Sequence, residues 1–283
     1  MFMENYAKIK IEDDFFNVLD TLSCGQVFRY KKYEQGFLVF SLDKCAYCYN
    51  FNGKAIIECK EKDKSYFERY FDLKKDYFEI YNFAKNCGYD FISSCAELGK
   101  GIRILKQDKF ETLLSFIISQ NNNIPRIQGI IEKLCLLGEK KKFMDHEYYA
   151  FPSVEKLSEQ NLDYFYSIGL GYRARYIKEL VNIPNLTQKL ESLNFLETNS
   201  LKRELLKIYG VGPKVADCVV FFGFSKTDSF PVDTWIEKVY KQDFNGNVVN
   251  RNKISDWFVC KFKSYSGYIQ QYLFHYKRNK EKN

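Results

Sequence analysis

A glycine-rich turn between two apolar helical runs constrains the fold of this chain more than any other segment. Residues 209–218 read Tyr-Gly-Val-Gly-Pro-Lys-Val-Ala-Asp-Cys. Glycine reaches left-handed backbone conformations without steric cost, and proline suits the first position of a helix. The pattern predicts a helical hairpin at about 200–224, whose turn at Gly210 and Gly212 presents backbone N–H groups that can bind a phosphate.

Lys214 and Asp233 stand at opposite ends of this helical unit and indicate chemistry on a sugar. Lys214 lies in the first turn of the second helix, where the helix dipole disfavours an added positive charge. A neutral amine is a nucleophile that can attack sugar C1′ and form a Schiff base. Asp233 precedes an amphipathic run, so we expect it to cap a third helix and to stabilise positive charge on the sugar. Each residue alone also fits an ordinary role, as a solvated lysine near phosphate or a simple cap, and only the combination favours an enzyme acting on DNA.

Composition permits a polyanionic partner without requiring one. The 283 residues include 43 basic and 36 acidic side chains, a net charge of +7, and 18% aromatic residues that could stack on bases. Nine cysteines, an odd number, argue against a disulfide framework and for a reducing compartment. No apolar run has membrane-spanning length. We therefore expect a soluble cytoplasmic protein that makes no membrane contact and associates with the nucleoid when bound to DNA.

Cysteine spacing gives no support for a metal site. Cys45 and Cys48 are separated as zinc ligands often are, but a structural zinc needs a second pair, and none follows. There is no run of four cysteines near the C-terminus that could hold an iron–sulfur cluster. We expect neither a metal nor another cofactor.

The periodicity of apolar residues divides the chain into two regions and predicts an α+β fold. Alternating runs predict an antiparallel sheet, with a hairpin at Asn52-Gly53. The runs cover residues 9–11, 37–40, 45–51 and 55–59. Because helical spacing follows at 63–87, residues 1–95 are expected to form an N-terminal antiparallel α+β domain. Helical patterns then dominate from about residue 107, so residues 96–283 are expected to form a two-part, all-α region that contains the hairpin.

Two polar breaks interrupt the helical patterns. Residues 119–123 read Ser-Gln-Asn-Asn-Asn, and asparagine both caps helices and tolerates turns. Residues 169–176 read Gly-Leu-Gly-Tyr-Arg-Ala-Arg-Tyr, which suits a solvated loop that begins a helix and a loop that faces DNA equally well.

Five segments together resemble the 8-oxoguanine DNA glycosylase family, within the helix-hairpin-helix, Gly/Pro-Asp glycosylase superfamily, in a prokaryotic-like form. They are residues 24–29, 119–126, 169–176, 210–218 with 231–233, and 267–274. The resemblance implies a bifunctional DNA glycosylase and AP lyase that flips 8-oxoguanine out of duplex DNA. Lys214 would expel the base and hold the sugar as a Schiff base before β-elimination, and Asp233 would stabilise the cationic sugar.

The resemblance also implies a pocket for the lesion. 8-Oxoguanine differs from guanine by a hydrogen at N7, which the backbone carbonyl of Gly25 would accept. Gln270 would read the Watson–Crick edge, and Cys218 and Phe274 would sandwich the base. Cys218 lies four residues after Lys214, so both project from one face of a helix.

On the duplex left behind, the resemblance implies contacts with the orphaned base. Asn121 would fill the vacated space and Tyr172 would act as a wedge beside that base. Arg126 and Arg173 would donate hydrogen bonds to cytosine. The implied partner is double-stranded DNA with 8-oxoguanine opposite cytosine, and we expect a monomer to bind it.

Two positions depart from the family pattern, and two other functions stay open. Trp235 replaces a histidine after the catalytic aspartate, and Gln120 replaces a serine before the three asparagines. One alternative is a glycosylase for another damaged base, although Lys214 counts against an enzyme that removes bases only by activating water. The other is a helix-hairpin-helix protein that binds DNA without catalysis. Borohydride separates these functions, because it traps a Schiff base as a permanent adduct.

Overall fold

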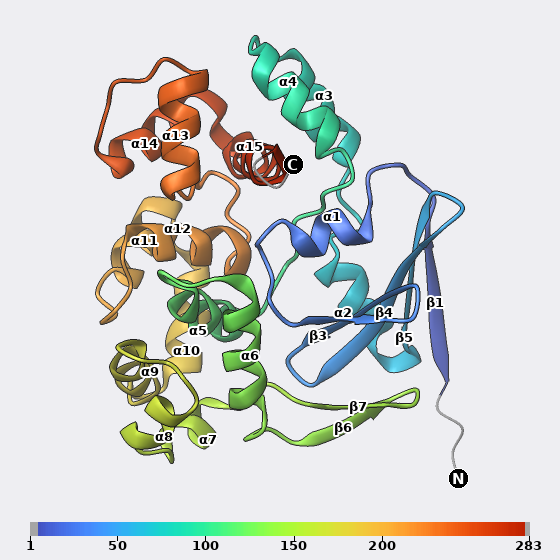
Figure 1. Cartoon of the computed structure of the whole chain (residues 1–283), viewed down its shortest axis with the longest axis vertical. Coiled ribbons are helices and arrows are strands. Elements are labelled where there is room, and N and C mark those ends of the chain that lie inside the picture. The colour runs from blue at the N-terminus through green and yellow to red at the C-terminus, as the bar shows by residue number, and fades with distance from the viewer. Residues whose placement is uncertain (1–4, 281–283) are drawn as a thin grey trace.

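A five-stranded antiparallel sheet lies on one side of the molecule and a helical region on the other (Figure 1). This computed structural model describes residues 5–280. The strand order is β1-β5-β4-β3-β2. The strands are β1 (Tyr6–Ile11), β2 (Tyr30–Tyr33), β3 (Gly36–Ser41), β4 (Lys44–Phe51) and β5 (Lys54–Lys60). The predicted sheet is confirmed, with β2 added as a short edge strand that the sequence did not predict.

The turn between β4 and β5 sets the register of the sheet. Asn52 and Gly53 both have positive φ, at 48° and 75°, as a two-residue turn that matches the twist of the strands requires. In the resulting register Phe51 pairs with Lys54 and Tyr49 with Ile56. Alternate residues of β4 therefore point to opposite faces of the sheet.

The N-terminal half also contains four helices, of which the first two pack on this sheet and the last two pack on each other. They are α1 (Val18–Ser23), α2 (Lys64–Tyr70), α3 (Tyr77–Asn86) and α4 (Asp90–Leu98). The helical spacing predicted from residue 63 onward corresponds first to α2, whose Phe67 and Tyr70 are buried in one cluster with Phe71 and with Val39 and Ile57 of the sheet. Burying each large apolar side chain contributes about 1.5–3 kcal/mol to the stability of the folded state.

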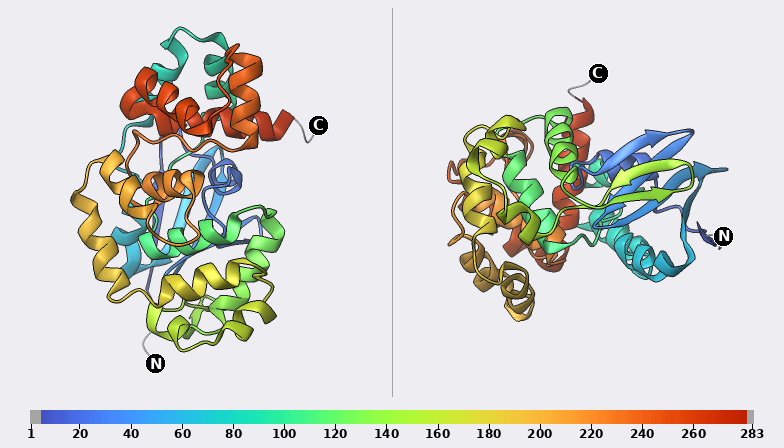
Figure 2. Two further views of the ribbon diagram at one scale, coloured as in Figure 1. Left: turned by 90° about the vertical axis from the view of Figure 1, so that its left-hand side faces the viewer. Right: turned by 90° about the horizontal axis from the view of Figure 1, so that it is seen from below.

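The second half of the chain is mainly helical, and its core forms around a central helix. Its helices are α5 (Lys109–Ser119), α6 (Ile124–Cys135), α7 (Val154–Ser158), α8 (Leu162–Ser167), α9 (Arg173–Val181), α10 (Leu186–Ser192), α11 (Thr198–Leu205), α12 (Pro213–Cys218), α13 (Thr234–Asp243), α14 (Arg251–Phe262) and α15 (Ser266–Lys280). All residues of α5 from Phe110 to Ile118 are buried. Seen from below, these helices lie together on one side and the strands on the other (Figure 2).

A β-hairpin interrupts the helical half and corrects the all-α description of that region. It consists of β6 (Lys140–Phe143) and β7 (His146–Tyr149). Phe143 and Tyr148 pack with Leu38 and Tyr47 on the outer face of the five-stranded sheet. The sequence did not reveal it, because the charged strand β6 lacks a clear alternation and its burial comes from a distant partner.

The C-terminal helix returns to the N-terminal half of the chain. In Figure 1 and in the left view of Figure 2, α15 lies beside α3 and α4, and it also packs on α13. Its residues Ile269 and Leu273 are fully buried in one cluster with Ile80 and Ile92. This core includes residues from both 1–95 and 96–283. The domain boundary between these two ranges therefore stays a prediction.

Candidate active site

The hairpin of α11 and α12 places an open turn in front of Lys214. Gly210 has φ of +85°, and a Cβ there would lie 2.3 Å from Cγ of Tyr176, so only glycine fits. Gly212 caps α12 without any side-chain hydrogen bond, and a Cβ there would meet no atom within 4 Å. The space beside Gly212 at the start of α12 is therefore open, and the first turn of a helix has backbone N–H groups without helical partners, as an anion site requires.

A buried ion pair ties the two hairpin helices together. Nζ of Lys202 on α11 lies 2.7 Å from Oδ1 of Asp217 on α12. Oγ of Ser229 donates to the backbone carbonyl of Asp217 at 3.1 Å. Burial raises the pKa of Asp217 to about 6, and Lys202 opposes that rise. This ion pair limits movement of α12 relative to α11 and thereby positions Lys214. The sequence did not predict the ion pair.

One narrow pocket contains the predicted catalytic and lesion-binding residues. Its lining includes Gly25, Lys214, Cys218, Asp233, Gln270 and Phe274. The pocket has a volume of about 40 Å³, which is room for a few water molecules. A purine can enter only after side chains move, and Phe274 is half-buried and not fully enclosed.

Lys214 and Cys218 share this pocket because they lie one helical turn apart on α12. Nζ of Lys214 stands 5.1 Å from the centre of the Phe116 ring, so its amine faces an aromatic wall. Cys218 is buried, and burial raises the pKa of its thiol to about 11 although Lys214 opposes the rise. Cys218 is therefore a neutral packing surface rather than a second nucleophile.

Asp233 is the N-cap of α13, as predicted. Its Oδ1 accepts from the backbone N–H groups of Trp235 at 3.0 Å and Ile236 at 2.9 Å. These bonds fix the carboxylate at the pocket that contains Lys214. A fixed carboxylate can stabilise a cation without reorganising during the reaction.

The residues predicted to bind the lesion come from opposite ends of the chain. Gly25 has φ of +84°, and a Cβ there would lie 3.0 Å from Cε1 of Phe274. Gln270 is 4% exposed, and its Nε2 donates to the carbonyl of Pro231 at 3.2 Å. Gln271 also lines the pocket and is equally buried. The sequence analysis did not predict a role for Gln271. The only feature of the sequence that pointed to it was its position next to Gln270 in the segment 267–274.

The two polar breaks of the sequence lie next to each other in space. Arg126 is exposed, and its Nη2 donates to the carbonyl of Gly169 at 3.2 Å. Asn121 is exposed, with φ of 48°, and Tyr172 is 50% exposed. Asn121, Arg126 and Tyr172 can therefore face a duplex from one surface.

Arg173, in contrast, is turned inward. It is 3% exposed, and its guanidinium donates to the carbonyls of Gln120 and Asn121, both at 2.9 Å. Burial lowers its pKa. Nε2 of Gln120 donates in turn to the carbonyl of Gly210 at 2.9 Å, which joins this loop to the hairpin. A contact between Arg173 and cytosine stays a prediction, because Arg173 would have to replace its hydrogen bonds to these two carbonyls with bonds to the base.

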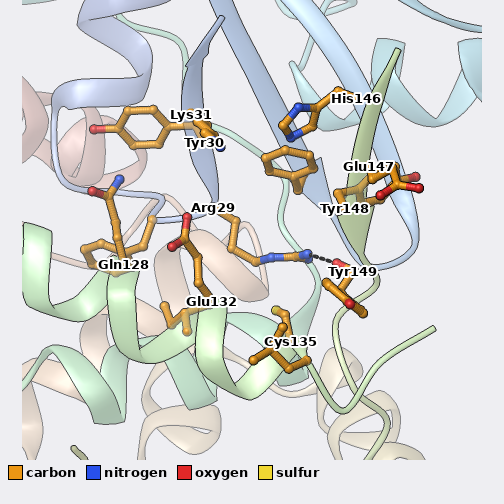
Figure 3. A pocket seen from close by; sticks show the side chains of 14 residues that line it. Arg29, Tyr30, Lys31, Gln128, Glu132, Cys135, His146, Glu147, Tyr148 and Tyr149 are labelled. Atoms are coloured by element: carbon orange, nitrogen blue, oxygen red, sulfur yellow. Dashed lines mark hydrogen bonds between the residues drawn. The ribbon is translucent and has the colours of Figure 1, made fainter. Parts of the chain in front are cut away.

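A second cavity, of about 220 Å³, lies between β2, α6 and β7 (Figure 3). None of the predicted site residues lines it. Arg29, which belongs to the first family segment, lies there and donates to the carbonyl of Tyr149 at 2.8 Å. It also forms a buried ion pair with Glu111 at 3.2 Å. These contacts join the sheet to α5 and the β6–β7 hairpin, so Arg29 has a structural role.

The Cys45 and Cys48 spacing does not create a metal site. The two residues point to opposite faces of β4, with Cys45 in the outer cluster and Cys48 in the inner one. All nine cysteines are free. Residues 5–280 contain no group of three His, Cys, Asp or Glu side chains that could hold an ion. Within the same residues, no helix combines the length and apolar character that crossing a bilayer demands.

A lysine on a glycine-rich helical hairpin, which shares one pocket with a capping aspartate, is the arrangement of a helix-hairpin-helix DNA glycosylase with lyase chemistry. Family comparisons agree. Residues 8–113 match the 8-oxoguanine DNA glycosylase N-terminal domain. Residues 114–255 match the HhH-GPD superfamily of base excision DNA repair proteins. The chain belongs to the 8-oxoguanine DNA glycosylase family, which confirms the predicted family and enzyme class.

Individual relatives support this membership. A probable N-glycosylase/DNA lyase of Methanothermobacter thermautotrophicus is 32% identical over 75% of this chain and 73% of its own length. The N-glycosylase/DNA lyase OGG1 of Arabidopsis thaliana is 33% identical over 62% of this chain and 52% of its own. The crystal structure of Clostridium acetobutylicum 8-oxoguanine glycosylase/lyase, with double-stranded DNA containing cytosine opposite 8-oxoguanine, is 36% identical. It covers 99% of each chain with a TM-score of 0.91.

Proposed function

We propose that this protein excises 8-oxoguanine from duplex DNA through a Schiff base on Lys214 and then cleaves the strand. One observation carries the proposal: Gly25, Lys214, Asp233 and Phe274, which are distant in the sequence, line a single pocket. The open hairpin turn beside that pocket suits a phosphate of the damaged strand, with Gly210 shaping the turn.

The chemistry follows from Lys214 and Asp233, which line the same pocket. Nζ of Lys214 attacks C1′ as the C1′–N9 bond breaks, and the base leaves with the electron pair and takes up a proton. Ring opening of the sugar then gives a protonated Schiff base, whose positive charge the carboxylate of Asp233 stabilises. Loss of a proton from C2′ breaks the C3′–O bond, which is β-elimination.

Recognition of the base uses the rest of the pocket. The carbonyl of Gly25 accepts the N7 hydrogen that distinguishes 8-oxoguanine from guanine. Cys218, as a neutral thiol, and the ring of Phe274 enclose the two faces of the base. Gln270 contributes amide groups to the Watson–Crick edge.

Duplex binding uses the adjoining exposed loops. Asn121 fills the space that the flipped nucleotide leaves, and Tyr172 acts as a wedge beside the orphaned base. Arg126 donates to the orphaned cytosine. Arg173 also donates to this cytosine after its guanidinium has given up its hydrogen bonds to the carbonyls of Gln120 and Asn121. We propose that the protein acts as a monomer and as a cytoplasmic, DNA-associated enzyme.

Excision from a panel of duplexes tests the proposed function. We expect 8-oxoguanine opposite cytosine to be released faster than 8-oxoguanine opposite adenine, and both faster than an alkylated purine or an oxidised pyrimidine. The physical reason is that Gly25 and the arginines each recognise one partner of the 8-oxoguanine–cytosine pair. Preferential release of an alkylated purine or an oxidised pyrimidine would assign the pocket to that lesion instead.

Phe274→Ala is expected to slow release of 8-oxoguanine about tenfold, because base–aromatic stacking is worth about 1–3 kcal/mol per base. Cleavage of a duplex that already contains an abasic site should change little, since Phe274 contacts the base and not the sugar. Single-turnover rates on the two duplexes measure the difference. Equal slowing of both reactions would show that Phe274 supports the fold of α15 rather than the base.

A further inference from the structure

Gln271 carries a buried hydrogen-bond acceptor that no residue in the described part of the chain satisfies. Its side chain is 4% exposed and lines the pocket of Lys214. Within residues 5–280, four buried side-chain N or O atoms lack a partner, and Oε1 of Gln271 is the one that belongs to this pocket. An unpaired buried acceptor is destabilising, so its presence in a ligand pocket indicates that the ligand supplies the donor.

The amide of Gln271 is also held in one orientation. Its Nε2 donates to Oε1 of Gln270 at 2.7 Å, and Nε2 of Gln270 donates to the carbonyl of Pro231 at 3.2 Å. This chain of bonds ends on a backbone carbonyl, which can only accept, so it determines the direction of both amides. Both amides belong to residues that line the pocket, so Oε1 of Gln271 and a remaining lone pair of Gln270 are two neighbouring acceptors at that pocket.

We propose that Gln271 is a second base-reading residue, which accepts an N–H from the Watson–Crick edge of the flipped base and orients the amide of Gln270. The inference rests on the proposed excision of 8-oxoguanine. A guanine-type edge carries donors at N1 and N2, so two neighbouring acceptors both find partners. An adenine-type edge has an unprotonated ring nitrogen in place of the N1 donor, which leaves one buried acceptor unpaired.

Gln271→Leu tests the proposal, because leucine fills a similar volume without an acceptor. Excision is compared on 8-oxoguanine and on 8-oxohypoxanthine, which lacks only the N2 amine, both opposite cytosine. We expect the wild type to release 8-oxoguanine about tenfold faster, in the range of one lost hydrogen bond. Gln271→Leu should release 8-oxoguanine about tenfold more slowly than the wild type and should treat the two purines alike, while cleavage of a pre-formed abasic site stays unchanged.

Other outcomes also decide the question. Equal slowing on both purines with intact abasic-site cleavage supports the proposal and assigns the contact to N1–H. Unchanged excision of 8-oxoguanine overturns it, and so does slowing of excision and abasic-site cleavage by the same factor. A wild type that releases neither purine would contradict the proposed function itself, which is a separate result.

Ile269→Val is the matched control, because Ile269 lies on the same helix and is fully buried outside the pocket. It shortens a core side chain of α15 without removing a polar group. We expect its preference for 8-oxoguanine over 8-oxohypoxanthine to equal that of the wild type. Loss of that preference in the control would attribute the effect to packing of α15 and overturn the role of Gln271.

Discussion

Lys214→Gln is expected to abolish the covalent adduct that borohydride traps between the protein and DNA containing 8-oxoguanine. Glutamine has no amine to attack C1′, so neither the Schiff base nor the β-elimination that follows it can form. Gel analysis of reduced reactions should show the adduct for the wild type alone. Mass spectrometry of the trapped species should place the sugar on residue 214.

Lys207→Gln provides a control with the same change in charge on the same hairpin. Lys207 is exposed and pairs with Glu204, 2.6 Å away at the surface. We expect this variant to trap DNA as the wild type does. Binding of intact duplex by Lys214→Gln should persist, because the open backbone N–H groups of the turn are unchanged. An undiminished adduct in Lys214→Gln would remove this lysine from the mechanism.

Asp233→Asn is expected to slow excision about 10²–10³-fold, the cost of removing one preorganised stabilising group. The carboxylate loses its charge while its shape is retained. Asparagine is as good a helix N-cap as aspartate, so the bonds to the N–H groups of Trp235 and Ile236 are preserved. The loss should therefore appear in the single-turnover rate on 8-oxoguanine opposite cytosine and not in the thermal unfolding temperature.

Two measurements separate this electrostatic role from a structural one. Asp233→Ala removes both the charge and the cap, and it should lower stability by about 1 kcal/mol in addition to the loss of rate. If Asp233→Asn kept the wild-type rate, the cap would be the only function of this residue. If both variants unfolded at the same lowered temperature, the loss of rate would reflect damage to α13.

The residues show which parts of the site follow from local sequence. Gly210 needs a positive φ, Asp233 caps the helix that begins at the next residue, and Lys214 and Cys218 are one turn apart. Each of these features depends on interactions within four residues, so the sequence pattern was sufficient. The same holds for the hairpin at Asn52-Gly53, where the turn chemistry determines the pairing of β4 and β5.

Other parts depend on long-range packing. The β6–β7 hairpin is buried by a sheet formed about 100 residues earlier in the chain, so its own alternation is weak. The inward position of Arg173 depends on carbonyls of another loop. The pairing of Lys202 with Asp217 depends on how two helices meet, and no spacing in the sequence specifies it.

The sequence by itself therefore determined the antiparallel sheet, the glycine-rich helical hairpin, the place of Lys214 at the start of its second helix and the capping carboxylate of Asp233. These features arise from backbone preferences and neighbouring side chains. Only the tertiary structure decided how closely Gly25 approaches Phe274, that the pocket they line is narrow, and that Gln271 beside it has an unpaired acceptor. These features depend on α15 packing back onto the start of the chain. That contact joins segments about 250 residues apart, and no local pattern encodes its geometry.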